Sequence, residues 1–269
     1  MSPLIVVLGV VLAFAAALRS TWSPCGLSML STITPLAETA RGHRYAATAS
    51  WFVAGAVVGG ATTGLLAAGL AAVLAPLDAS PAALLGVLAL AALAGAAVDG
   101  GLFGRLVPFH KRQVDDAWLR QFRAWVYGGG FGFQIGTGLM TYIMTTAVLG
   151  VILAAALTAT PWMAFAIVTL FGTLRGLVVL LGSRITSPMR LADFHRGFDA
   201  WREPVRLALV VVLGAVAAVA AVGAWGLSVP AAGVVLAAVA VTAAGVRKPA
   251  PVGGQTPVPD AVPSVVQPA

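Results

Sequence analysis

The sequence contains very few charged residues. Only 9% of its 269 residues are charged and 59% are hydrophobic, whereas a soluble domain usually carries about 25% charged residues. Sixteen basic and nine acidic side chains are too few to cover a globule of this size. A soluble enzyme is therefore excluded. The mean hydropathy of +0.96 predicts an all-α, polytopic membrane protein, long enough for roughly six to eight crossings.

Cysteine and histidine are also scarce. Cys25 is the only cysteine, so an intramolecular disulfide, a two-cysteine redox pair and a four-cysteine zinc site are excluded within the chain. His43, His110 and His195 stand in separate basic loops and make no convincing metal site. No pattern of acid–base or nucleophile partners indicates an enzyme. We therefore expect neither a metal nor a cofactor.

The basic residues that are present gather in four short segments. Residues 41–44 hold two, 105–123 five, 184–206 five and 247–248 two. Such clustering indicates membrane topology rather than nucleic-acid binding, because short cytoplasmic loops are enriched in Lys and Arg. The expected partner is the lipid bilayer. The predicted location is the cytoplasmic membrane, with the N-terminus outside and the C-terminus in the cytoplasm.

Seven apolar segments are predicted to span the membrane. Their boundaries lie near residues 1–37, 46–74, 82–98, 127–157, 162–182, 207–225 and 231–246. Seven spans place all four basic segments on one side, whereas merging the last two spans would put 247–248 outside. The aromatic spacing in segments 105–123 and 184–206 predicts interfacial amphipathic helices. Residues 1–248 thus form one transmembrane domain, and the proline-rich tail 249–269 is expected to be disordered.

The first and fourth spans share an unusual pattern. Each is interrupted by glycine or proline, at Ser23-Pro24-Cys25-Gly26 and at Gly136-Thr137-Gly138, and each is rich in hydroxyls. Each also opens a unit of three spans, so the halves, about 3–100 and 114–206, are predicted to be inverted repeats followed by two last helices in 207–246. Matching interrupted helices in two halves point to a binding site between them. Chance similarity between apolar segments is the alternative.

Two arginines lie within predicted spans rather than in basic loops. A charge inside a bilayer must face the protein interior or water. For Arg175 we predict a structural ion pair with Asp99, which closes the third span, with Glu38 as another possible partner. Arg19 has no acidic residue at its predicted depth. An anionic ligand or backbone carbonyls are therefore its expected partners.

The polar residues around the two interruptions define the predicted site. Hydroxyls there either satisfy backbone groups freed by proline or line a polar cavity together with Arg19. Cys25 is either a small buried hydrophobe or a reactive thiol activated by a nearby arginine. The candidate substrate-binding residues are Arg19, Ser23, Pro24, Cys25, Gln134, Thr137 and Thr141.

The segment Ser23-Pro24-Cys25-Gly26-Leu27 in an interrupted first span resembles the transmembrane thiol–disulfide carriers of cytochrome c biogenesis, the CcdA/DsbD type. The resemblance implies two inverted three-helix halves, each with a broken helix and a Pro-Cys pair. It also implies electron relay from a thioredoxin-like partner, with Cys25 as the first redox residue. Thr137 occupies the second redox position, so the dithiol relay cannot run in this chain alone.

Two functions remain open from the sequence. The first is transport of a small, anionic solute through a site near Arg19, Cys25, Gln134 and Thr137. The second is thiol-redox chemistry in which Cys25, as the catalytic residue, forms a mixed disulfide with a thioredoxin-like protein. A noncatalytic membrane role is the third possibility. The polar lining around Arg19 favours transport.

Overall fold

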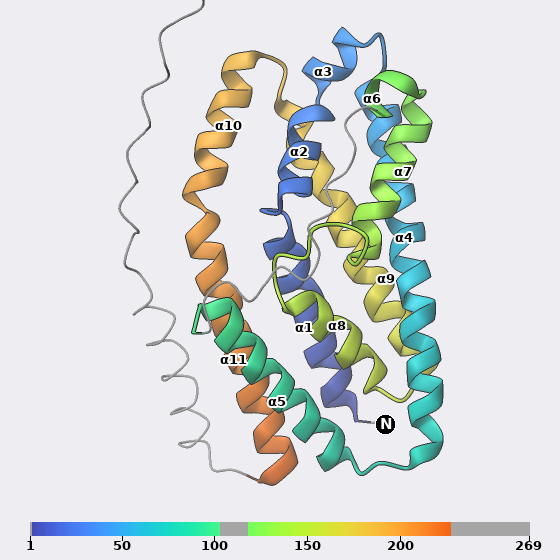
Figure 1. Ribbon diagram of the computed structural model, residues 1–269, viewed down its shortest axis with the longest axis vertical. Helices are drawn as coiled ribbons and strands as arrows, with labels where there is room; N and C mark the ends of the chain where they lie inside the picture. The colour runs from blue at the N-terminus through green and yellow to red at the C-terminus, as the bar shows by residue number, and fades with distance from the viewer. Residues whose placement is uncertain (1, 103–117, 227–269) are drawn as a thin grey trace, which may run out of the picture.

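The computed structural model describes residues 2–102 and 118–226. These two ranges are folded as helices joined by short turns and one longer loop (Figure 1). The α-helices are α1 (Pro3–Ser20), α2 (Pro24–Thr32), α3 (Pro35–Ala40), α4 (Tyr45–Leu74), α5 (Pro81–Gly100), α6 (Trp118–Gln121), α7 (Ala124–Thr137), α8 (Ala147–Ala156), α9 (Pro161–Leu177), α10 (Pro188–Ala200) and α11 (Arg202–Trp225). Two 3-10 helices, η1 (Ala75–Leu77) and η2 (Val178–Arg184), extend α4 and α9.

Five helical stretches are long and apolar enough to cross a membrane. They are Pro3–Ser20, Tyr45–Leu77, Pro81–Gly100, Pro161–Arg184 and Pro188–Trp225, and α8 is a shorter apolar helix. This confirms the all-α class and agrees with a membrane protein that crosses the bilayer several times. The predicted second, third, fifth and sixth spans coincide with α4, α5, α9–η2 and α11 to within a few residues. The predicted seventh span and the proline-rich tail lie outside the described residues.

The first span is interrupted close to the predicted position. α1 ends at Ser20 and α2 begins at Pro24, whose ring tolerates the first helical position because no N–H is needed there. The Ser23 hydroxyl accepts a hydrogen bond of 3.2 Å from the Gly26 N–H and caps the new helix. A Cβ on Gly26 would lie 2.4 Å from the Thr21 carbonyl oxygen. Proline, serine and glycine together therefore produce the break.

The fourth span is interrupted too, and over a longer stretch than its sequence suggests. α7 ends at Thr137, and Gly138 follows with φ +72, which glycine adopts without steric cost. Helix resumes only at Ala147, so residues 138–146 connect α7 to α8 as a non-helical loop (Figure 1). The predicted continuous span 127–157 is therefore two helices, and Thr145 and Thr146 in the segment between them hydrogen-bond to Asp99 of α5.

Helix α4 forms the centre of a closely packed group with α7 and α9. The approach is close because glycines face the neighbouring backbone. A Cβ on Gly132 of α7 would lie 1.9 Å from the Phe52 carbonyl oxygen, and one on Gly136 would lie 2.1 Å from that of Ala56. Small residues allow such contact between helices in lipid. Close packing against α4 is thus the role of Gly132 and Gly136.

Helix α10 was expected to be interfacial, but it runs along the bundle beside α2 and leads directly into α11 (Figure 1). Its aromatic face explains this placement. Phe198 stacks on Trp22 with ring centroids 4.3 Å apart, and the Trp22 indole N–H donates to the Phe198 carbonyl oxygen at 2.7 Å. Phe194 packs against the same cluster, whereas Trp201, the third member of the predicted face, is 64% exposed.

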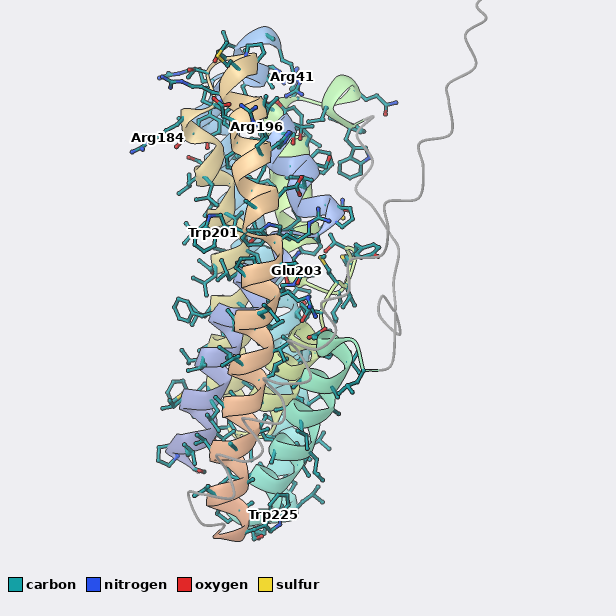
Figure 2. All side chains as sticks on the ribbon, turned by 90° about the vertical axis from the view of Figure 1, so that its left-hand side faces the viewer. Arg41, Arg184, Arg196, Trp201, Glu203 and Trp225 are labelled. Atoms are coloured by element: carbon teal, nitrogen blue, oxygen red, sulfur yellow. The ribbon has the colours of Figure 1, made fainter. Side chains whose placement is uncertain are left out.

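The two ends of the bundle differ in charge. Arg41, Arg184 and Arg196 gather at the end formed by α2, α3 and α10, whereas Trp225 marks the opposite end (Figure 2). The segment 184–206 does not stay at the basic end, because Glu203 lies well down the bundle in the same view. Part of the third basic segment therefore extends toward the interrupted helices.

Candidate functional site

Arg19 lies at the end of α1, directly before the first interruption. Its side chain is only 6% exposed, and its Nη1 atom has no hydrogen-bond partner among the residues that the structure describes. The charges acting on it are those of Asp99, Glu203, Arg206 and Arg202. A buried guanidinium N–H without a partner costs free energy. Arg19 therefore holds a buried donor atom whose hydrogen-bonding capacity the described residues leave unused.

Asp99 closes α5 next to this arginine. Its Oδ2 accepts hydrogen bonds from the Thr145 and Thr146 hydroxyls at 2.7 and 2.9 Å, and its Oδ1 accepts from the Thr146 N–H at 3.3 Å. The Asp99 carbonyl oxygen accepts from Arg206 Nη1 at 3.1 Å. The carboxylate thus ties the end of α5 to the segment 138–146, and its carbonyl ties the same point to the start of α11.

The predicted ion pair between Asp99 and Arg175 is wrong. Arg175 donates instead to the Ile135 carbonyl oxygen at 2.7 Å and lies over the Phe171 ring, 5.7 Å from its centroid. The acid near Arg19, which was expected to have none, is Asp99. The Asp99 carboxylate is held instead by Thr145 and Thr146, which residues 138–146 carry across to the end of α5.

Arg175 lies in a second polar region beside the break between α1 and α2. It is 4% exposed and contributes to the lining of a cavity of about 20 Å³, room for roughly one water-sized group. Ser20, Thr21 and Gly26 line the cavity from the interrupted first span. Both buried arginines therefore lie at the junction of α1 and α2.

The three predicted site residues after the break take different positions. The Ser23 hydroxyl is committed to capping α2, and Pro24 is exposed as its first residue. Cys25 is fully buried in an apolar cluster that includes Phe52 and Ile135. Arg175 and Cys25 interact electrostatically. Ser23 and Pro24 shape the start of α2, so Cys25 is the residue of these three with a group that could react.

The predicted residues of the fourth span lie on or near the second break. The half-buried Gln134 accepts a hydrogen bond from the Thr137 hydroxyl at 2.7 Å through its carbonyl oxygen. The Thr137 hydroxyl also accepts from the Met140 N–H at 3.3 Å, so it stabilises the end of α7. Thr141 is 1% exposed, and its Oγ1 has no partner among the described residues. Thr141 is therefore the residue of this set with a free polar atom.

Sequence reasoning missed a buried polar network at the basic end. Glu38 is fully buried in α3. Its Oε2 accepts from the Thr48 and Tyr127 hydroxyls at 2.6 and 2.7 Å, and its Oε1 accepts from Arg41 Nη1 at 2.8 Å. This carboxylate joins α3 to α4 and α7. A usable signal was the placement of an acidic residue three positions before an arginine at the end of an apolar span.

The sequence is similar to those of several curated proteins that share one name. The chain is 35% identical over 187 residues to the methylamine utilization protein MauF of Paracoccus denitrificans, covering 67% of this chain and 65% of that protein. Identity to MauF of Paracoccus versutus is 31% over 174 residues, covering 62% and 61%. For MauF of Methylophilus methylotrophus it is 35% over 147 residues, covering 51% and 48%.

The matched part thus spans about half to two thirds of the length of these relatives. No family model matches the chain, and no solved structure matches it. The similarity supports a relationship to MauF over the matched part of the chain.

Proposed function

We propose that this chain is a membrane carrier for a small anionic solute, which binds where the two interrupted helices meet. The observation that carries the proposal is the buried Arg19 Nη1 atom without a hydrogen-bond partner among the described residues. An anion there would supply the missing acceptor. A hydrogen bond to a charged group contributes about 1.5–3 kcal/mol.

The architecture around Arg19 supports a carrier. Broken helices at corresponding places in two halves are typical of secondary transporters. Here α1–α2 and α7–α8 are both interrupted, and they run in opposite directions along the bundle (Figure 1). We therefore include in the proposal two inverted halves of the CcdA/DsbD type, 3–100 and 114–206. The gathering of arginines at one end supports a cytoplasmic position for that end.

The relatives are named for methylamine utilization, and we propose that this chain also acts in that process. We do not extend it to methylamine itself as the solute, because an ammonium group needs a carboxylate with free acceptor capacity. The buried Glu38 and the half-buried Asp99 already accept hydrogen bonds from three donor groups each. The groups that remain free, Arg19 Nη1 and Thr141 Oγ1, suit an anion instead.

Replacing Arg19 by glutamine is expected to weaken anion binding by at least about tenfold, because one hydrogen bond to a charged group is lost. Chloride, nitrate and sulfate would be titrated into purified protein in nanodiscs and followed by calorimetry. Uptake of the same anions into proteoliposomes would be measured in parallel. Arg19→Lys, which keeps the charge, should retain part of the affinity.

The matched control is Arg196→Gln, because Arg196 has a side chain 79% exposed at the basic end and pairs only with Asp193 among the described acids. It should bind and transport as the unmodified protein does. Equal binding by Arg19→Gln and the unmodified protein would rule out the proposed site.

A second function, thiol-redox chemistry, is supported by one observation. Cys25 is the second residue of α2, and it interacts electrostatically with Arg175. In this function the Cys25 thiolate attacks a disulfide of a thioredoxin-like partner, forming a mixed disulfide and releasing one partner thiol.

Acid quenching and alkylation of membranes incubated with an oxidised thioredoxin should then trap a mixed disulfide that Cys25→Ser lacks. Arg175→Gln should reduce the yield while leaving the protein folded. Normal anion transport by Cys25→Ser, together with no trapped adduct, would reject the redox function and leave transport standing.

A further inference from the structure

We propose that Asp99 is a proton-binding site coupled to the anion site at Arg19, so that the chain binds a small anion together with one proton. This inference rests on the proposed function, because it names what accompanies the anion. It is carried by the placement of one carboxylate beside one incompletely paired guanidinium, both at interruptions or ends of apolar helices.

Arg19 lies near an acid but forms no ion pair with it. Asp99 is the nearby acid whose charge acts most strongly on Arg19, yet the two side chains form no ion pair within 4.0 Å in the described part of the chain. Instead, Asp99 is held by Thr145 and Thr146. The carboxylate therefore offsets part of the guanidinium charge from a distance, and the buried Nη1 atom keeps no hydrogen-bond partner among the described residues.

An incoming anion would face both charges. With Asp99 ionised, its negative charge repels the anion and cancels part of the attraction of Arg19. A proton from bulk water that forms an O–H bond on an Asp99 oxygen removes this repulsion. The anion then binds Arg19, and the net charge of the site is unchanged because one proton and one anion have entered together. The Thr145 and Thr146 hydroxyls can rotate to accept as well as donate.

The other ionisable groups near Asp99 and Arg19 are few and already paired. Glu203 Oε2 accepts from Arg206 Nε at 2.7 Å, and Arg202 lies 3.2 Å from Asp199. The segment that carries Thr145 and Thr146 contributes no ionisable group beyond the distant Tyr142, and α8 contributes none. Glu203 is 62% exposed, so its charge is screened by water. Asp99 is therefore the group whose protonation would change the site most.

The coupling predicts a pH dependence. Chloride, nitrate and sulfate keep their own charges between about pH 5 and pH 8, so any change in their affinity reports the protein. Calorimetry on the full chain in nanodiscs should show affinity falling by up to about tenfold per pH unit as the pH rises. Asp99→Asn, which keeps the shape and one acceptor oxygen, should bind at least as tightly at all pH values and lose this dependence. Glu203→Gln is the matched control and should keep it.

A second measurement needs no variant. Adding anion to unmodified protein in weakly buffered solution with a pH indicator should take up about one proton per anion bound near neutral pH. Three outcomes would overturn the coupling and leave the proposed function intact, provided that binding still depends on Arg19. The anion affinity could be independent of pH, binding could take up no proton, or Asp99→Asn could keep the pH dependence of the affinity. No binding of any of the three anions, or equal binding by Arg19→Gln, would overturn both.

Discussion

Gly132→Ala is expected to separate α7 from α4 and to lower the free energy of unfolding by about 3 kcal/mol or more. The added Cβ would lie 1.9 Å from the Phe52 carbonyl oxygen, a backbone atom that cannot move without shifting α4. Overpacking against side chains costs about 1–3 kcal/mol, and a contact with backbone has fewer ways to relax. The loss would be measured by thermal and denaturant unfolding of the purified protein in detergent.

The same substitution in open space provides the control. Gly69 lies in α4 itself, and nothing lies within 4 Å of a Cβ built there. Gly69→Ala should leave stability within about 0.5 kcal/mol or raise it slightly, because alanine restricts the unfolded chain and favours helix. Equal stability of the Gly132 and Gly69 variants would show that α4 and α7 are not in backbone contact.

The sequence predicted the fold class and the breaks well, because both follow from local chemistry. Apolar length indicated the spans, and the Ser-Pro-Cys-Gly run placed the first break to within a few residues of the gap between Ser20 and Pro24. The extent of the second break was missed. Gly138 marks its start, but residues 139–146 have the composition of an apolar span, and only the tertiary bonds to Asp99 show why they stay non-helical.

The site was predicted in part. Arg19 and Thr141 were chosen for their position near the breaks, and both have a buried polar atom without a partner in the described ranges. The partner of Asp99 was predicted wrongly, because depth along a helix does not give its rotation. The sequence placed Asp99 at the depth of Arg175 and not at that of Arg19, whereas in the folded chain its charge acts on Arg19 and Arg175 bonds to the Ile135 carbonyl oxygen.

Glu38→Gln is expected to lower the free energy of unfolding by about 3 kcal/mol, since hydrogen bonds to a buried charged group are lost. The carboxylate accepts from Thr48, Tyr127 and Arg41. An amide presents one oxygen and one N–H₂ group to these donors, so at least one donor loses its acceptor. Arg41 is 27% exposed and can be hydrated, whereas the Thr48 side chain is fully buried and has no access to water.

Glu203→Gln is the matched control, because Glu203 also pairs with an arginine three residues away but is 62% exposed. Its cost should stay below about 1 kcal/mol, as for other exposed ion pairs. A double-mutant cycle then identifies the contact responsible. Combining Glu38→Gln with Tyr127→Phe should cost less than the sum of the two, because both changes remove the same hydrogen bond. If the costs simply add, or if Glu38→Gln is as mild as Glu203→Gln, then Glu38 does not join α3 to α7, and the basic end of the broken first span is held by other contacts.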